Sequence, residues 1–245
     1  NAITLLKSGA STTILSGTNT HRGSTLVNAG TLLIEGRLSE SPVSVAGTGR
    51  LGGNGTIDGT VTVQSGATLA PGTSIGHLTV NNDVTLEPGS VLELEISAAN
   101  LTNDVLSVAG TLTGNGTLLV SNIGGTLSGG MKFKLLEAAV INGSFASLVL
   151  PPLEGGMDWN FSLETGELSV IATNAPALAT AVSENSLTLS WPAGHLGWRL
   201  QVQTNSLGTG LGNNWVDVPN SAFTNQMTLP VDPENGAVFY RLVYP

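Results

Sequence analysis

The chain has 245 residues, a formal net charge of −9 at pH 7, 40% hydrophobic residues and only 10% charged residues. Disordered chains combine low hydrophobicity with high charge, so this composition excludes a disordered protein. The eight Lys and Arg residues are scattered along the sequence. Nucleic acid is bound by clustered cations, so no nucleic-acid partner is expected. The chain has no cysteine, which excludes disulfides and thiolate metal sites.

The apolar residues are mostly Val, Leu and Ile, and they are accompanied by 32 glycines and many Thr, Ser and Asn. This composition is typical of short strands that are separated by tight turns. A membrane-spanning helix needs a run of about 18 apolar residues, and the sequence contains none, so no transmembrane segment is predicted. The chain begins at Asn1 without a charged and apolar leader, which predicts a mature chain or an excised fragment.

One short pattern recurs through residues 1–130: a glycine, a small residue, and then Leu or Val in a β-type run. It occurs at 30–33, 55–57, 59–61, 66–69, 89–92, 110–112 and 116–118. Alternation with period 2, as in residues 92–96, places successive side chains on opposite faces of a strand. Repeated strands without helical periodicity predict a solenoid, in which stacked turns share one apolar core. The expected fold is a parallel β-helix.

These segments carry a resemblance to a known family. Residues 15–20 (Leu-Ser-Gly-Thr-Asn-Thr) and 25–32 (Thr-Leu-Val-Asn-Ala-Gly-Thr-Leu) closely resemble the autotransporter-associated β-strand repeat. Residues 70–80 resemble a segment that recurs in such passenger domains, and residues 103–108 and 133–145 resemble the end of the passenger helix. The likeness covers residues 1–172. It implies a right-handed parallel β-helix that is presented outside the cell or on the bacterial cell surface.

Composition changes near residues 173–177, which we predict to be a linker, and three of the four tryptophans follow it. Strands are predicted at 186–191, 197–204, 215–218, 226–231 and 237–243. Apolar and polar residues alternate in these strands, as a two-layer sandwich requires. Residues 178–245 are therefore predicted to form a small antiparallel β-sandwich that resembles fibronectin type III or immunoglobulin modules. The predicted fold class of the whole chain is all-β.

Two segments match catalytic motifs without their structural context. Residues 72–76 (Gly-Thr-Ser-Ile-Gly) match the G-x-S-x-G nucleophile elbow. That elbow is a strand-to-helix turn, whereas His77 and the residues after it are strand-like. Residues 47–52 match the dinucleotide fingerprint G-x-G-x-x-G, but no helix follows to receive a pyrophosphate. We interpret both segments as solenoid corners.

Paired carboxylates are the strongest enzymatic candidate in the sequence. Glu93 and Glu95 alternate with apolar residues, so both face outward from the predicted strand. Glycosidases use clustered carboxylates, but a solvated strand face explains the pair fully. The three histidines, His21, His77 and His195, lack the spacing of metal ligands. No catalytic residue, metal site or cofactor is therefore predicted.

Tryptophans suggest a second kind of site, because aromatic rings can stack on sugars. Trp191 and Trp198 are in phase with apolar strand positions, which predicts packing in the core. Trp215 follows the glycine-rich segment 208–214 and is the candidate for an exposed ligand contact.

The start of the chain suggests self-association. Residues 3–6 (Ile-Thr-Leu-Leu) are already strand-like, with no polar cap before them. A β-helix that begins there exposes unpaired backbone groups and an apolar core end. Ile3, Leu5 and Leu6 are thus the candidate assembly edge, and a contact with a different surface of a neighbour would produce rings or filaments.

Together these observations predict a non-catalytic, secreted or cell-surface protein with a structural or adhesive role. Self-association into an oligomer or filament is the predicted partner interaction, and surface glycans are the alternative partner. A carbohydrate-binding adhesin is therefore the second hypothesis. A carbohydrate-active enzyme that uses Glu93 and Glu95 is the third.

Overall fold

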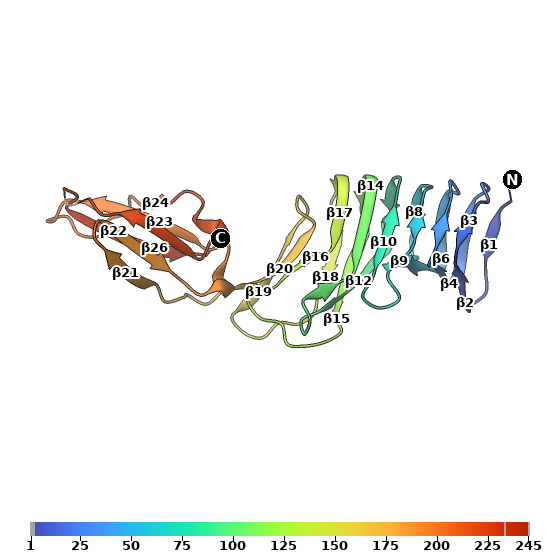
Figure 1. The fold of residues 1–245 in the computed structure, drawn as a ribbon, viewed down its shortest axis with the longest axis horizontal. Coiled ribbons are helices and arrows are strands. Elements are labelled where there is room, and N and C mark those ends of the chain that lie inside the picture. The colour runs from blue at the N-terminus through green and yellow to red at the C-terminus, as the bar shows by residue number, and fades with distance from the viewer. Residues whose placement is uncertain (1–2, 233, 245) are drawn as a thin grey trace. The chain divides into compact units, whose positions relative to one another are not determined.

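A computed structural model describes residues 3–232 and 234–244 of the chain. The described residues form strands and two short 3-10 turns, η1 (Ala193–His195) and η2 (Ser221–Phe223), without an α-helix (Figure 1). The predicted all-β class is confirmed. The chain divides into two compact units. The first extends to Thr126 and includes Lys132–Pro152 and Phe161–Leu168, whereas the second includes Leu127–Met131, Leu153–Asn160 and the chain from Ser169 onward. The predicted linker at 173–177 stays a prediction.

Most of the first unit is one extensive parallel sheet that winds into three stacks of strands. The strands that appear in only one stack are β1 (Leu5–Lys7), β2 (Thr12–Leu15), β3 (Thr18–Asn19), β5 (Arg37–Leu38), β7 (Thr56–Ile57), β8 (Val61–Val63), β9 (Thr68–Pro71), β10 (His77–Val80), β11 (Val84–Leu86), β12 (Val91–Ser97), β15 (Thr117–Asn122) and β18 (Ser147–Val149). Four longer strands contribute to two stacks each: β4 (Thr25–Ile34), β6 (Val43–Gly53), β14 (Val105–Gly114) and β17 (Leu136–Gly143).

The chain visits the three stacks in a fixed order and then repeats. The second coil, for example, uses the two halves of β4 and then β5, and each of these pairs in parallel with its counterpart in the next coil. One insertion departs from this pattern, because β13 (Thr102–Asn103) folds back as an antiparallel partner of β12. This winding is the parallel β-helix that the repeats predict.

Aliphatic columns fill the interior of the β-helix. In the first stack, the register links Leu5, Thr25, Val43, Val61, Val84, Leu112 and Ile141. In the second stack, it links Leu32, Leu51, Leu69, Leu92 and Leu118, each of which is 0% exposed. Full burial of one such side chain contributes about 1.5–3 kcal/mol, so each column stabilises the stacking of successive coils.

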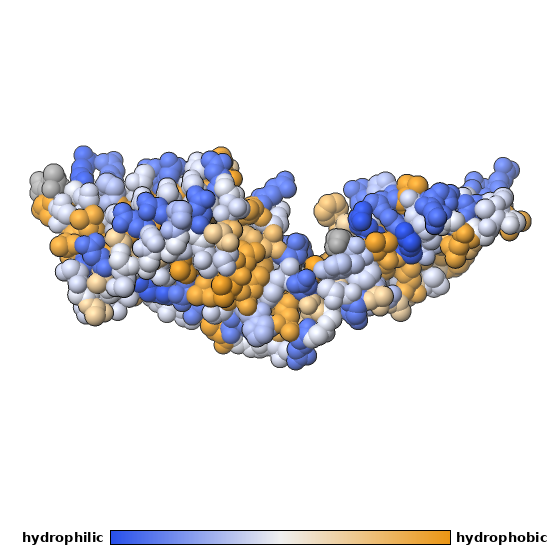
Figure 2. All heavy atoms as spheres, turned by 180° about the vertical axis from the view of Figure 1, so that it is seen from behind, coloured by the Kyte–Doolittle hydropathy of each residue, from blue (hydrophilic) through white to orange (hydrophobic). Residues whose placement is uncertain are grey.

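Outward positions in the third stack are polar. Thr18, Arg37, Thr56, Thr79, Ser107 and Glu137 form one outward column through β3, β5, β7, β10, β14 and β17. Figure 2 shows polar and intermediate residues over much of the visible surface of this unit, with apolar areas between them. The alternation in the sequence therefore sorts side chains between core and solvent as predicted.

Glycines allow the coils to approach closely at their corners. Gly53 ends β6 with φ +106°, and a Cβ atom on it would lie 2.2 Å from the carbonyl oxygen of Ile34 in the preceding coil. No side chain fits there, and L-residues rarely adopt this φ.

After the β-helix, β16 (Lys132–Lys134), β20 (Glu167–Ala172) and β19 (Met157–Ser162) form a three-stranded sheet in that order. Phe133 is 0% exposed, whereas Lys132 and Lys134 on either side of it are exposed, as alternation in a strand requires.

The C-terminal residues form two three-stranded antiparallel sheets. One has the order β21 (Ala179–Ser183), β22 (Ser186–Ser190), β25 (Gln226–Pro230), and the other has β24 (Val216–Asp217), β23 (Arg199–Asn205), β26 (Ala237–Val243). Side chains from both sheets pack around Leu189, Trp191, Leu200 and Val218. A small β-sandwich is thus confirmed. Its similarity to fibronectin type III modules stays a prediction, and β21 was not foreseen.

We expect Val61→Asp to unfold or strongly destabilise the β-helix. Val61 is 1% exposed in an aliphatic column, so the carboxylate would be buried without a partner. The free energy of unfolding should fall by on the order of 3 kcal/mol or more, measured by chemical denaturation. Thr62→Asp, at the neighbouring outward position, is the matched control and should change stability far less. Equal effects of the two substitutions would show that Val61 and Thr62 are not assigned to the correct faces of β8.

Candidate functional site

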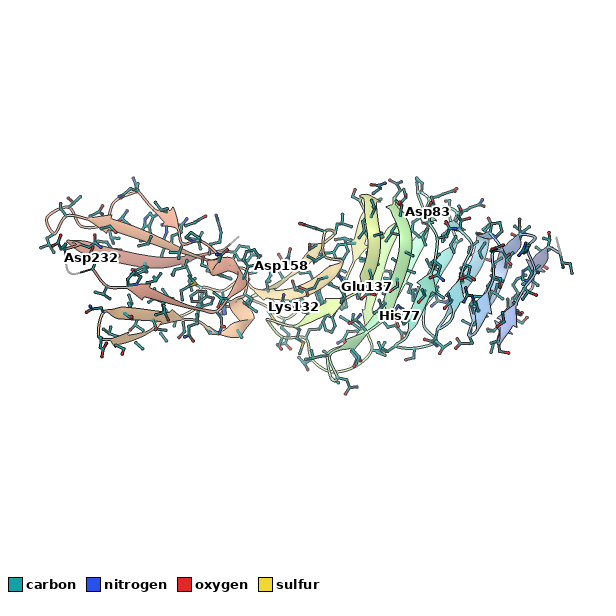
Figure 3. All side chains as sticks on the ribbon, turned by 45° about the horizontal axis from the view of Figure 1, so that its top comes forward. His77, Asp83, Lys132, Glu137, Asp158 and Asp232 are labelled. Carbon is teal, nitrogen blue, oxygen red and sulfur yellow. The ribbon has the colours of Figure 1, made fainter. Side chains whose placement is uncertain are left out.

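The histidine that follows the 72–76 segment contacts a serine other than Ser74. The loop at 72–76 leads into β10, and Nε2 of His77 lies 2.7 Å from the hydroxyl of Ser107 instead. Ser107 in turn donates to Oε2 of Glu137 at 2.7 Å. In a triad the histidine lies between serine and carboxylate. Here the serine lies between them, as a cross-strand chain through β10, β14 and β17 in which Figure 3 labels His77 and Glu137.

The structure brings further polar residues to the predicted carboxylate pair. Glu93 and Glu95 are half-buried on the outward face of β12, as their spacing predicts. Arg50 of β6 forms an ion pair with Glu93, although 43 residues separate them in the sequence. Asp104, which follows the inserted β13, lines the same cavity of about 160 Å³ together with Ser74. This cavity, with Arg50, Glu93, Glu95 and Asp104, is the carboxylate site.

Small residues allow neighbouring coils to approach closely beside this cavity. Gly52 and Ala70 are register partners on the outward side of β6 and β9, and neither has a side chain beyond Cβ. A Cβ on Gly52 would lie 2.4 Å from the carbonyl oxygen of Ala70, so a larger residue does not fit. The loop that begins at Gly72 lies over this region, since Gly72 and Gly53 exchange two backbone hydrogen bonds.

Asp104 lines the carboxylate site and was not foreseen from the sequence. It is 2% exposed, and its Oδ1 and Oδ2 accept hydrogen bonds from the backbone N–H of Gly76 at 2.8 Å and of Glu95 at 2.7 Å. Its side chain thus ties the 72–76 loop of one coil to β12 of the next. The only signal in the sequence is an Asp directly before a strand, and that signal does not reveal a partner 28 residues away.

Burial is the main reason why Asp104 has an unusual pKa. Desolvation raises the pKa of this carboxyl from 3.8 to about 6, the two backbone hydrogen bonds oppose the rise, and the charges of Glu95 and Glu93 add to it. A carboxyl with a pKa of about 6 is partly protonated at mildly acidic pH, and beside two further carboxylates it has the donor set of a general acid there. The two backbone hydrogen bonds also suffice for a purely structural role, because each carboxylate oxygen of Asp104 accepts one of them.

Trp215 is half-buried, and one face of its ring is already covered. The guanidinium carbon of Arg241 lies 4.3 Å from the ring centroid, the arrangement of a cation–π contact. Arg241 also donates from Nε to Gln201, whose amide donates to Asp217. Trp191 and Trp198 are 3% and 5% exposed, which confirms their packing in the core. The ligand-contact role of Trp215 stays a prediction.

The residues of the expected assembly edge lie at the start of the first described strand. The strand begins at Leu5 rather than Ile3, and it pairs with β4. Ile3 and Leu6 are 61% and 56% exposed, whereas Leu5 is half-buried. The core column next to Leu5 holds Lys7, which is 6% exposed, and its ammonium donates to the carbonyl oxygens of Gly9 and Ala29. A charged residue is therefore buried two positions after Leu5, and the role of Ile3, Leu5 and Leu6 as an assembly edge stays a prediction.

The described part of the chain holds no group of three or more His, Asp or Glu side chains that could bind a metal ion. His21 and His195 each have a different polar neighbour, the hydroxyl of Thr25 and the carbonyl of Asn174, both 2.9 Å away. Within the described residues, no helix has the length and apolar character needed to cross a membrane.

Comparison with known proteins supports the resemblance found in the sequence. The family described as passenger-associated-transport-repeat matches residues 5–34. The predicted resemblance to autotransporter passenger repeats is confirmed. Among curated proteins, the extracellular serine protease of Serratia marcescens is 37% identical over 117 residues, which are 48% of this chain and 11% of the relative. The adhesin BmaC autotransporter of Brucella suis biovar 1 (strain 1330) is 42% identical over 135 residues, which are 51% of this chain and 4% of the relative.

The matched region is thus a small part of each relative. One relative is named an extracellular serine protease and the other an adhesin autotransporter. They confirm the predicted location outside the cell or on the bacterial cell surface.

We expect Asp104 to make the β-helix more stable as the pH falls. Its folded-state pKa of about 6 is above the ordinary 3.8, so its stabilising contribution is fully present below about pH 4 and is lost as the pH rises through 6. The pH-dependent difference in unfolding free energy between the native chain and Asp104→Asn should span roughly 2–3 kcal/mol, because each pKa unit corresponds to about 1.4 kcal/mol.

Urea denaturation at a series of pH values from 4 to 8 measures this difference. Asp83→Asn serves as the control for a carboxylate that also accepts a backbone hydrogen bond, from Thr111, but is exposed. A difference between the native chain and Asp104→Asn that does not change with pH would contradict the prediction.

Proposed function

We propose that this chain is a non-catalytic structural or adhesive part of a secreted or surface-attached bacterial protein. The aliphatic columns support this proposal, because Leu51, Leu69, Leu92 and Leu118 in one column and Val43, Val61 and Val84 in another are buried in register through successive coils. Shared burial of this kind makes each coil depend on its neighbours and produces a stable, extended scaffold. The match to a passenger repeat and the adhesin relative support the same role.

We expect the purified chain to show no turnover of simple esters or acidic polysaccharides. The Ser-His contact needed for ester hydrolysis is replaced by the His77–Ser107 contact, and Asp104 is held by two backbone groups. Product release should remain at the level of a buffer blank, as measured by chromophore release and by reducing-end assays. Activity that disappears in Ser74→Ala or in Glu93→Gln, with the fold retained, would contradict the proposal.

A carbohydrate-binding adhesin is the second candidate, and Trp215 is the observation that favours it. Its ring and Arg241, Gln201 and Asp217 together form one hydrogen-bonded group of aromatic, cationic and amide side chains. Aromatic rings with adjacent polar groups are suited to sugar recognition, since the ring provides apolar contact and the polar groups fix orientation.

We expect this candidate, if correct, to give binding on a glycan array that Trp215→Ala lowers at least several-fold. Phe223→Ala is the matched control, because Phe223 is 85% exposed on the same unit and has no polar network. Array signals that the two variants lower equally, or a blank array, would remove the glycan hypothesis. The predicted self-association is a separate proposal that light scattering can address.

A further inference from the structure

The core of the β-sandwich is filled around Trp191 and hollow beyond it. Leu189, Trp191, Leu200 and Val218 are at most 8% exposed. Four side chains packed against them, Leu187, Val202, Leu229 and Tyr240, are only partly buried. These four line a cavity of about 480 Å³. That volume is in the range of small-molecule sites, which are typically about 300–1,000 Å³.

Both sheets contribute to the walls of this cavity. Leu187 and Leu229 come from β22 and β25, and Val202, Val216 and Tyr240 come from β23, β24 and β26. Among the described residues, β24 and β25 are edge strands of their sheets. Val216 and Val238, which are 64% and 37% exposed, form the rim, so solvent reaches the space between the sheets.

The charge distribution selects the kind of ligand. Asp217 and Asp232 are the charged residues among the lining residues, and neither Lys nor Arg is among them. The Asp217 carboxylate is occupied by Arg199 and Gln201, each at 2.7 Å. Asp232, which Figure 3 labels, is exposed and accepts a hydrogen bond from the backbone N–H of Glu234 through Oδ1. The Asp232 carboxylate is thus the one that can contact a ligand. The chain's net charge of −9 further disfavours anionic ligands.

Tyr240 adds a neutral polar group to the apolar wall. Burial raises the pKa of its phenol above the ordinary 10, so the hydroxyl keeps its proton at physiological pH. The wall therefore presents aliphatic surface and a neutral hydroxyl, with a negative charge near the rim.

We propose that this cavity binds a small apolar molecule that carries an amino group. Its apolar body enters between Leu187, Val202 and Leu229, and its ammonium lies beside Asp232. This binding site goes beyond the structural or adhesive role and does not depend on it. Fatty acids and other apolar anions are the ligands that the charge distribution disfavours.

Two probes with the same indole body and opposite charge test this proposal: tryptamine and 3-indolepropionate. The full chain, with methyl-labelled Leu and Val, is titrated with each probe and followed by NMR. Tryptamine should produce saturable shifts in the methyl signals of Leu187, Val202 and Leu229, and 3-indolepropionate should bind more weakly. Asp232→Asn should lower the tryptamine affinity roughly two- to five-fold, the size expected for one exposed charge pair, and should not weaken the anion.

A variant that fills the cavity provides the second test. Val238→Phe places an aromatic ring at the rim and should abolish the tryptamine shifts. Val182→Phe is the matched control, because Val182 is 72% exposed on β21 and does not line the cavity. If Val238→Phe fails to fold, the two probes and Asp232→Asn still decide the matter. No saturable shift at millimolar tryptamine, shifts confined to other residues, or equal binding of 3-indolepropionate would overturn the proposal.

Discussion

In-register stacking of aliphatic side chains is the constraint on which the rest of the first unit depends. A single coil has short strands, of two to seven residues where a strand belongs to one stack, and cannot bury an apolar core by itself. Each coil is stable because Leu51, Leu69 and Leu92 lie directly above one another, with the valine column beside them. This requirement explains the nearly uniform use of Val, Leu and Ile, since a large aromatic ring would separate neighbouring coils.

The same stacking creates the polar sites at the corners. Corners of successive coils lie on top of each other, so a side chain at one corner can bond to the backbone of the next. Asp104 does so with Gly76, and Asn54 does so with the backbone N–H of His77. Buried polar groups are costly unless they are paired, so these side chains hold loops that have no strand partner of their own. The carboxylate site thus connects adjacent coils, and the raised pKa of Asp104 follows from the burial of its side chain.

The second unit follows a different rule, because its two sheets bury one shared layer and need not repeat. Trp191 packs in that layer with Leu189 and Leu200, and the buried Trp198 donates from Nε1 to the carbonyl of Ala172 at 2.7 Å. Smaller residues such as Val202 and Val238 line the cavity between the sheets. A solenoid cannot leave such a gap without separating its coils, so a cavity of this size arises in the sandwich rather than in the β-helix.

Local and periodic features were determined by the sequence alone. Alternation revealed which residues of β8 and β12 face inward, and glycine spacing revealed the coils, because both signals are contained within a few consecutive residues. The strands β22, β23, β25 and β26 were found for the same reason. The sites were decided only by the tertiary structure. Arg50 meets Glu93, Asp104 meets Gly76, and Arg241 covers Trp215 through contacts between residues 26 to 43 positions apart. Such contacts depend on how many residues each coil or loop contains, and a periodic pattern does not record where those lengths bring two distant side chains together.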